Sequence, residues 1–246
     1  KSAASELVIT LEPTGVYHEA LMYFLHEQGF NIILANTGKA KKYADALNII
    51  HKTDKSDATM LAHYGCAKHA VVDYWQPEAL EVRELKALIR RLDALESNRQ
   101  REANRLDANE FSNVSARVCQ SIKVTIAFLD DEIKQLKSDI DNHIDNEPDL
   151  KRNRKLLESI PGIGPVLSRE LTYLFAAKKF NKAKEAAAYC GLIPRHNESG
   201  KLKGRTTISK LGPARIRCKL YMAAIVAGQW NKRIKRHKLT LINNGK

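Results

Sequence analysis

The sequence predicts an α/β layer followed by an all-α remainder. In the first part of the chain, short apolar runs alternate with segments of helical spacing, which is typical of an α/β layer. In the middle part, apolar residues recur at heptad spacing, which indicates a long helical segment. In the last part, helical segments flank a turn that contains Gly and Pro. We therefore expect three domains, at 1–76, 77–149 and 150–246.

The first domain begins with a predicted β-α-β unit. Residues 6–11 are strand-like, residues 16–28 have helical spacing, and Gly29 ends this helix before a second apolar strand at residues 30–34. The pattern also predicts helices at 39–47 and 54–64, a short strand at 71–74 and a boundary at Pro77.

The middle domain has apolar residues at coiled-coil positions. In two runs, at 85–95 and 122–140, they follow one another at spacings of three and four residues, with charged residues between them; the stretch between the runs is weaker, and an acidic turn follows at 145–149. This indicates either a coiled coil that joins copies or separates two domains, or a helical pair within one chain. The positions are Leu85, Leu88, Leu92, Leu95, Ile122, Ile126, Leu129, Ile133, Leu136 and Ile140.

The last domain opens with a motif of the helix-hairpin-helix type, in which Gly162 and Gly164 lie in the turn between two helices. Such glycines allow a tight turn that exposes backbone N–H groups at a helix N-terminus, where a DNA phosphate can bind. A plain turn between two helices is the alternative interpretation.

Positive charge is concentrated at the C-terminal end. The formal net charge is +13, and residues 199–246 hold 13 Lys and Arg and no Asp or Glu. Such a block neutralises phosphates and predicts nucleic-acid binding. A solvated basic tail is the alternative. It is disfavoured because apolar residues such as Ile216, Leu220 and Ile225 occur in the block at helical spacing.

Membrane insertion and a cysteine-based metal site are not expected. No apolar run reaches the roughly 20 residues of a membrane span, and no signal sequence is recognisable, so a cytoplasmic location is expected. The four cysteines are far apart and form no CxxC motif, which is typical of reduced thiols.

Three carboxylates of the first domain are candidate metal ligands. Glu12 closes a predicted strand, and Asp54 and Asp57 lie three residues apart at the start of a predicted helix. Hard oxygen ligands that converge would suit Mg²⁺ or Mn²⁺, which assist displacement at phosphorus. The alternative is that Asp54 is a helix N-cap and Asp57 a first-turn acid.

Ser199 is the candidate nucleophile, because it stands beside Gly200 in a loop surrounded by cations. The alternative is a turn or a simple phosphate contact. His196 is close in sequence, but we expect it to be a bystander. The cations of this segment that are expected to contact DNA include Lys201, Lys203, Arg205, Lys210 and Arg217.

Four motifs occur together in one order. They are EPTGVY from Glu12, KTDKSDA from Lys52, ESIPGIG from Glu158, and a segment that runs from YCGLIP at Tyr189 through Ser199 and Gly200 to Ser209, Lys210, Gly212 and Arg217. In this order they resemble the insertion-sequence 110 family of transposases, relatives of the Piv invertase. The resemblance spans nearly the whole chain.

The resemblance implies a partial RuvC-like, RNase H-type domain with an Asp-Glu-Asp-Asp metal site, a coiled coil, and a C-terminal transposase domain. Glu12, Asp54 and Asp57 would be three of the four acids and Ser199 the nucleophile. The implied reaction is DNA strand exchange through a transient 5′-phosphoserine link, assisted by Mg²⁺ (or Mn²⁺).

The resemblance also implies partners. Family members act as multimers, dimers or tetramers, with active sites drawn from different subunits. Some are directed to DNA by a structured non-coding RNA of the element, so a guide RNA is a candidate partner beside DNA. A bacterial, nucleoid-associated location follows from this interpretation.

The chain also departs from the family pattern. The first Asp of the family precedes the Glu-Pro-Thr-Gly motif, and this sequence starts at Lys1 without it; the C-terminal end at Asn243 to Lys246 is also short of the pattern. We therefore expect a chain truncated at both ends, with weak or absent recombinase activity and retained nucleic-acid binding. Two competing hypotheses are a non-catalytic binding remnant and a simple metal nuclease.

Overall fold

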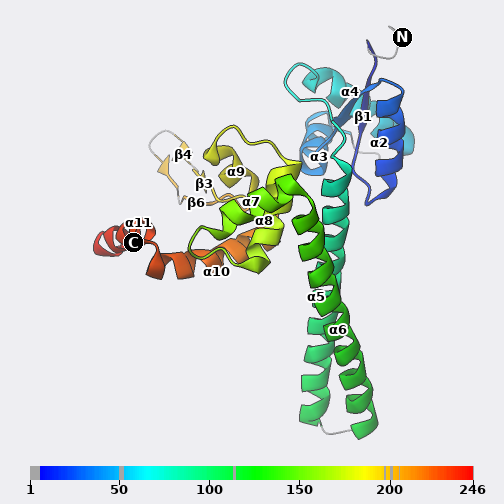
Figure 1. Ribbon diagram of the computed structural model, residues 1–246. Helices are drawn as coiled ribbons and strands as arrows, with labels where there is room; N and C mark the ends of the chain where they lie inside the picture. The colour runs from blue at the N-terminus through cyan, green and yellow to red at the C-terminus, as the bar shows by residue number, and fades with distance from the viewer. Residues whose placement is uncertain are drawn as a thin grey trace. The chain divides into compact units, whose positions relative to one another are not determined.

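The computed structural model describes residues 6–49, 53–112, 115–196, 198–199, 202–204 and 206–245, with the backbone alone at 198, 199, 202 and 203. The chain divides into two compact units, Lys1–Glu78 and Ala79–Lys246, and each is described by itself (Figure 1). The expected division into three domains stays a prediction. Within the described ranges, no helix is both long and apolar enough to cross a membrane.

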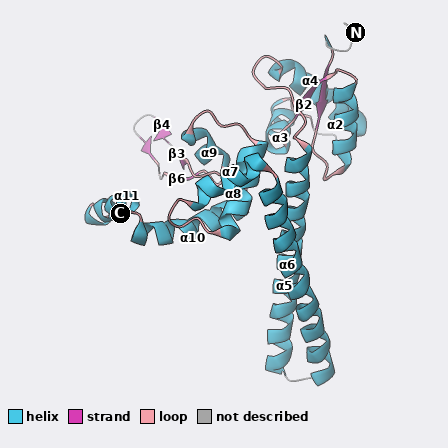
Figure 2. Cartoon of the chain, in the orientation of Figure 1, coloured by secondary structure: helices cyan, strands magenta, loops and turns pink. Residues whose placement is uncertain are grey.

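The first unit contains the expected β-α-β arrangement. Strands β1 (Val8–Leu11) and β2 (Asn31–Leu34) pair in parallel, with Val8 opposite Asn31 and Leu11 opposite Leu34. Helix α2 (Tyr17–Glu27) connects them, as a parallel crossover requires. It ends before Gly29, whose φ of +83° is the left-handed conformation that favours glycine. Figure 2 shows the strands against the surrounding helices.

Two further helices follow, α3 (Thr37–Ala46) and α4 (Asp54–Lys68). Helix α4 starts with a capping box, in which Thr53 and Ser56 exchange hydrogen bonds between side chain and backbone. It crosses β1 closely, because a Cβ at Gly65 would lie 2.1 Å from Oγ1 of Thr10. The buried residues of this region are Ala35, Ala40, Met60 and Tyr64.

The strand expected at 71–74 is wrong. These residues form a turn after α4, in which the N–H of Val71 donates to the carbonyl of Lys68 at 2.9 Å. One residue later, the N–H of Trp75 donates to the carbonyl of Ile32 at 2.7 Å, as in a strand ladder. One such bond makes no strand. The indole of Trp75 instead packs edge-on against the ring of Tyr23, with centroids 5.0 Å apart.

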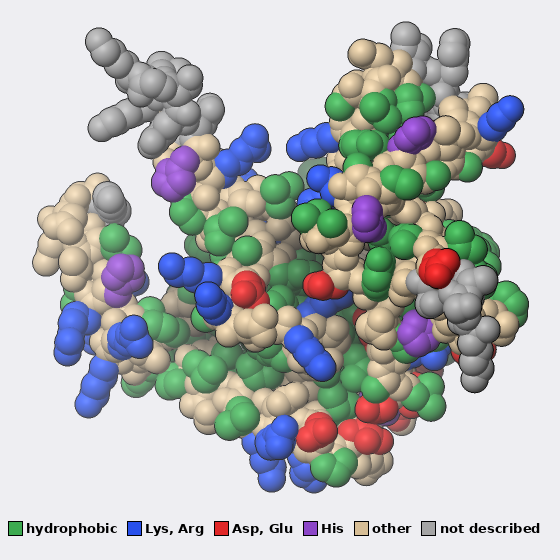
Figure 3. All heavy atoms as spheres, turned by 90° about the horizontal axis from the view of Figure 1, so that it is seen from above, with side chains coloured by type: hydrophobic (Ala, Val, Ile, Leu, Met, Phe, Trp, Pro, Cys, Tyr) green, Lys and Arg blue, Asp and Glu red, His purple; other side chains and the backbone are tan. Residues whose placement is uncertain are grey.

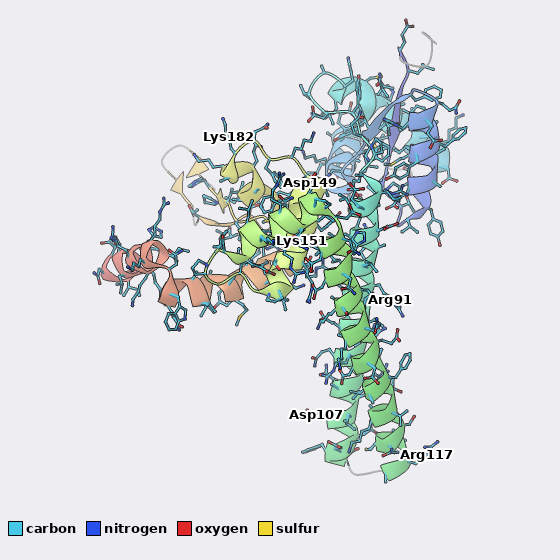
Figure 4. The ribbon with its side chains drawn as sticks, in the orientation of Figure 1. Arg91, Asp107, Arg117, Asp149, Lys151 and Lys182 are labelled. Carbon is cyan, nitrogen blue, oxygen red and sulfur yellow. The ribbon has the colours of Figure 1, made fainter. Side chains whose placement is uncertain are left out.

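The second unit begins with two long helices, α5 (Leu80–Ser112) and α6 (Ala116–Asn146). Their ion pairs show an antiparallel hairpin: Glu110 pairs with Lys123, Asp130 with Arg99, and Glu96 with Lys137, at 2.8 to 2.9 Å. Figure 4 shows Arg91 and Asp107 along α5 and Arg117 at the start of α6. Most of the heptad residues are buried between these helices, so they form a pair within one chain. The buried residues are Val82, Leu85, Ile89, Leu92, Leu95, Leu129, Ile133, Ile140, Ile144 and Leu150.

The remaining helices gather around a second core. Helix α7 (Pro148–Glu158) and helix α8 (Pro165–Ala177) pack against each other, and α8 also packs against α10 (Ala214–Trp230). Helices α9 (Ala183–Tyr189) and α11 (Lys232–Asn243) complete the unit. The buried residues of this core are Leu157, Leu167, Leu171, Leu174, Cys190 and Ile216.

A small β-ribbon connects α9 to α10. Strand β3 (Pro194–Arg195) pairs with β6 (Thr207–Ile208), and β4 (Glu198–Ser199) pairs with β5 (Leu202–Lys203), all antiparallel. We call residues 191–212 the ribbon.

Candidate functional site

The three carboxylates predicted as metal ligands lie in the first unit. Glu12 directly follows β1, Asp54 is the first residue of α4, and Asp57 lies three residues later. The N-cap of α4 is Thr53, so Asp54 is not needed for capping. Both aspartates lie in the first turn, where a negative charge is favourable in any helix.

The carboxyl ends of strands β1 and β2 lie side by side, and Glu12 follows the first of them. The N–H of Ala35, which follows β2, donates to the carbonyl of Leu11 at 2.8 Å, so the carboxyl ends of both strands are adjacent. Met60, one turn after Asp57, belongs to the same buried cluster as Ala35. Helix α4 therefore packs, through Met60, near the residue that follows β2.

The carboxylate oxygens are the ligands that Mg²⁺ prefers, so the donor set fits a hard divalent cation. In the parts of the chain that the structure describes, however, no group of three or more His, Cys, Asp or Glu side chains is close enough to hold a metal. Glu12, Asp54 and Asp57 stay predicted ligands.

The ribbon is anchored where its two ends cross. Gly191 has a φ of +69° and Gly212 a φ of +144°, and a Cβ at Gly212 would lie 2.1 Å from the carbonyl oxygen of Tyr189. Only glycine permits this approach of two backbones. The N–H groups of Ser209 and Lys210 donate to the carbonyls of Ile193 and Gly191, at 2.9 and 3.1 Å. These bonds join the incoming and outgoing chain at the root of the ribbon.

Ser199 lies at the far part of this ribbon. Its backbone belongs to β4 and pairs with Leu202 of β5. In the same ladder, the backbone of Lys203 lies opposite that of Glu198. Lys201 and Arg205 lie outside the described residues. His196, expected to be a bystander, lies between β3 and β4 with its Nδ1 3.3 Å from Oγ1 of Thr206.

Arg217, predicted to contact DNA, has an internal role. Its Nη1 donates to the carbonyl of Gly212 at 2.7 Å and to the carbonyl of Cys190 at 3.2 Å. The Cys190 thiol is buried, which raises its pKa, and the charge of Arg217 offsets part of this shift. Direct DNA contact by Arg217 stays a prediction.

The two other cations of α10 also face inward. Arg215 pairs with Asp93 of α5 and with Glu170 of α8, and the Nζ of Lys219 lies 2.6 Å from Oε1 of Glu170. The side chain of Glu170 is only 4% exposed. Burial raises the pKa of its carboxyl group, and Lys219 lowers it in part. This cluster joins the hairpin to α8 and α10.

A second ionic cluster joins α6, α7 and α8. Arg169 binds Asp141 through two hydrogen bonds, of 2.8 and 2.6 Å, and Arg154 lies 3.1 Å from the same carboxylate. The bonds from Arg169 lower the pKa of Asp141. The hydroxyl of Ser168 donates to Glu158 at 2.7 Å and lowers the pKa of that carboxyl group. These bonds hold α7 and α8, the two helices that flank the glycine turn, against each other and against α6.

The glycine turn packs against α10. Gly162 has a φ of +101°, and a Cβ there would lie 2.7 Å from the carbonyl oxygen of Ala223. Gly164 is the N-cap of α8, makes no side-chain cap and has open space around it. Phosphate contacts at both glycines stay predictions. The turn borders an apolar groove of about 470 Å³, lined by Gly162, Gly164, Pro165, Val166, Leu167, Cys218, Lys219, Met222, Ala223 and Val226.

Helix α11 is basic and exposed. It begins at the N-cap Asn231, which accepts hydrogen bonds from the N–H groups of Arg233 and Ile234, and none of its residues is buried. In Figure 3, where α11 lies at the left edge of the view, Lys and Arg side chains gather on it without Asp or Glu. Five cations lie within seven residues, and the structure gives none of them an ion pair among the residues it describes. They are Lys232, Arg233, Lys235, Arg236 and Lys238.

Comparisons with known proteins agree with the motif order. Residues 1–109 match a family model described as Transposase, of the DEDD type of the IS110 group, and residues 154–238 match the Transposase IS116/IS110/IS902 family. The chain is 31% identical, over 224 residues, to the pilin gene-inverting proteins of Moraxella bovis and Moraxella lacunata. The matched region covers 90% of this chain and 67% of each relative.

The chain belongs to the IS110 family of transposases. The resemblance predicted from the motifs is confirmed, and with it the assignment as a DNA transposase or recombinase. Membership of a transposase family implies that the protein binds DNA.

Sequence reasoning missed the cations of α11 as individual site candidates. The prediction named residues of the ribbon and of α10, although the densest run of positive charge lies at residues 232–238. The available signal was the amphipathic spacing of the segment, in which Ile234 lies within that run and Leu241 follows seven residues later.

Proposed function

We propose that this transposase exchanges DNA strands through a covalent link to Ser199. The observation that carries the proposal is the ribbon: it holds Ser199 in β4, and no Asp or Glu follows Glu198 in the sequence. The cations that follow Ser199 in the sequence can offset the negative charge of a phosphodiester that approaches its hydroxyl. The motif order of the family supports the same residue.

The proposed step is a transesterification. The Ser199 oxygen attacks a phosphorus atom of DNA, an Oγ–P bond forms, and the bond from phosphorus to the 3′-oxygen breaks. The proton of the hydroxyl passes through solvent to the departing 3′-oxygen. A 3′-hydroxyl of a second strand then reverses the step on the same phosphorus and regenerates serine. One phosphodiester replaces another, so no external energy source is required.

Glu12, Asp54 and Asp57 are proposed to hold Mg²⁺ in an RNase H-type, RuvC-like domain. Glu12 follows β1 and Asp57 lies in α4, the helix that packs against β1, which supports a shared ligand set. When bound, the ion would supply positive charge that stabilises attacking and departing oxygens. The carboxylates themselves fix its position and keep the site acceptor-rich.

The glycine turn is proposed to be a helix-hairpin-helix that contacts a phosphate through Gly164. The open space around Gly164 supports this, whereas α10 packs directly against Gly162. A coiled-coil contact between copies and a guide RNA remain part of the proposal on the family resemblance alone.

The proposed enzyme acts as a multimer in which acids of one copy serve Ser199 of another. Mixing an inactive Ser199→Ala protein with an inactive Asp57→Asn protein should then restore strand exchange. If every mixture stays inactive while wild-type protein at the same total concentration is active, the acids and the serine act within one copy.

The decisive test uses DNA that flanks the gene for this chain, nicked so that a covalent intermediate accumulates. Wild-type protein with Mg²⁺ should form a protein–DNA adduct, and Ser199→Ala should form none. Thr207→Ala removes another exposed hydroxyl of the ribbon and serves as the matched control. An adduct that persists in Ser199→Ala would refute the assignment.

A second candidate function is nucleic-acid binding without catalysis, which the exposed cations of α11 favour. Salt-dependent DNA binding by a wild-type protein that forms neither adduct nor cleaved ends would support this function in place of the first.

A further inference from the structure

We infer that Arg217 is a positioning residue for the ribbon and not a DNA contact. Its guanidinium group ties together the two chain segments from which the ribbon emerges. The inference rests on the proposed role of Ser199, because it concerns the segment that carries this serine.

The geometry of Arg217 is that of a clamp. One nitrogen, Nη1, donates both to Cys190, just before the ribbon, and to Gly212, at its end. Bonds from a charged donor are stronger than bonds between neutral groups. A single side chain therefore joins the incoming and the outgoing backbone.

The clamp is fixed to the core. Arg217 lies in the second turn of α10, next to Ile216, which is 6% exposed and packs with Leu171 and Leu174. The guanidinium can reach the backbone because Gly191 has no side chain: a Cβ there would lie 3.0 Å from Nη1. The position of the ribbon root is thus set by the helical core through Arg217.

The ribbon itself has little else to hold it. Of residues 192–211, none that the structure describes belongs to a buried apolar cluster. Its apolar side chains are exposed instead, and they include Leu192, Ile193, Ile208 and Leu211. Two-stranded ribbons are marginal without a packed face. The direction in which the ribbon presents Ser199 therefore depends on the bonds at its root.

A positioning residue and a phosphate contact give opposite results. Loss of a phosphate contact weakens DNA affinity and flattens its salt dependence. Loss of a clamp leaves affinity unchanged and slows the reaction of bound DNA, because a small displacement of a reacting group is costly.

The test measures the rate of adduct formation at saturating DNA, together with the affinity. We expect Arg217→Ala to lower the saturating rate by about tenfold to a hundredfold at unchanged affinity and salt dependence. Methylguanidinium in the buffer should restore part of the rate, and Arg217→Lys should retain part of it. The contrasting variant, Arg233→Ala on α11, should weaken affinity and reduce its salt dependence.

A loss of affinity with an unchanged saturating rate in Arg217→Ala would overturn the inference. So would a lowered rate that methylguanidinium does not restore. These outcomes differ from failure of the proposed function, in which wild-type protein itself forms no adduct.

If wild-type protein forms no adduct, amide hydrogen exchange of the full chain still tests the role of Arg217, because it requires no reaction with DNA. The amides of Ser209 and Lys210, bonded across the ribbon root, should exchange faster in Arg217→Ala, whereas the amide of buried Leu171 should not change. Methylguanidinium should restore protection at Ser209 and Lys210. Equal exchange at these two amides in both proteins would refute the clamp.

Discussion

Helices α10 and α11 follow one another in a segment without a single acidic residue, yet their cations behave differently. On α10, Arg215, Arg217 and Lys219 all bind groups inside the protein, either carboxylates or backbone carbonyls. On α11, the five cations at 232–238 lie on an exposed helix. Charge density in the sequence therefore does not identify which cation meets DNA.

The difference has a packing cause. Helix α10 contacts α8 and the glycine turn and contains buried residues, so its cations lie where partners are within reach. Helix α11 packs against α10, and no residue of it is buried. Its cations lie on the surface, and the structure gives them no ion pair among the residues that it describes.

The largest expected effect concerns the inward cations. Glu170→Ala would leave Arg215 and Lys219 without their shared carboxylate in a largely buried place. We expect the free energy of unfolding to fall by about 3 kcal/mol. Urea denaturation of the full chain measures it.

The control is Glu110→Ala, which removes an exposed ion pair with Lys123 on the hairpin. Exposed pairs contribute little, so no clear change in the urea midpoint is expected. Equal effects of the two substitutions would mean that the cluster around Glu170 is not internal.

The second effect sharpens the role of α10 as an internal helix. Gly162→Ala combines an unfavourable φ with a clash against the Ala223 carbonyl, so we expect a loss of about 2 kcal/mol in the free energy of unfolding. Gly164→Ala, in the same motif, has an ordinary φ and open space and should be close to neutral. Thermal denaturation of both variants compares them. Similar melting temperatures would contradict the packing of the turn on α10.

The third effect is pH-dependent and concerns Asp141. Because its pKa is lowered in the folded state, first by the bonds from Arg169, it stabilises the fold above its ordinary pKa near 3.8. This contribution is lost as the pH falls through the lower folded-state pKa. Asp141→Asn should therefore be less stable than wild type by about 1 kcal/mol at neutral pH. The difference should shrink in acid, as urea midpoints at several pH values would show; a constant difference would contradict this origin.

The fold followed from the sequence where periodicity is local. The β-α-β unit and the long hairpin have apolar patterns that fix their type within one segment. The strand expected at 71–74 is wrong because a strand needs a ladder of bonds to a partner strand, and the single bond from Trp75 to Ile32 does not make one. The β-propensity of residues 71–74 does not show whether a partner strand lies beside them.

The sequence predicted the candidate site only in part, because several of its contacts also join residues that are distant in the chain. The internal role of Arg217 depends on the carbonyl of Cys190, 27 residues away, and that of Arg215 on Glu170, 45 residues away. A sequence motif shows that an arginine is present but not which distant group it binds. The metal ligands, the nucleophile and the DNA contacts therefore stay predictions.

The most direct measurement is the salt dependence of affinity for a DNA duplex of arbitrary sequence. Replacement of Arg233 and Arg236 by Ala together should reduce the slope of log affinity against log salt by about 2, because two phosphate contacts are lost. Arg217→Ala should leave the slope unchanged. A reduced slope in Arg217→Ala and an unchanged slope in the α11 variant would contradict the division of the basic segment into an internal and a DNA-facing helix.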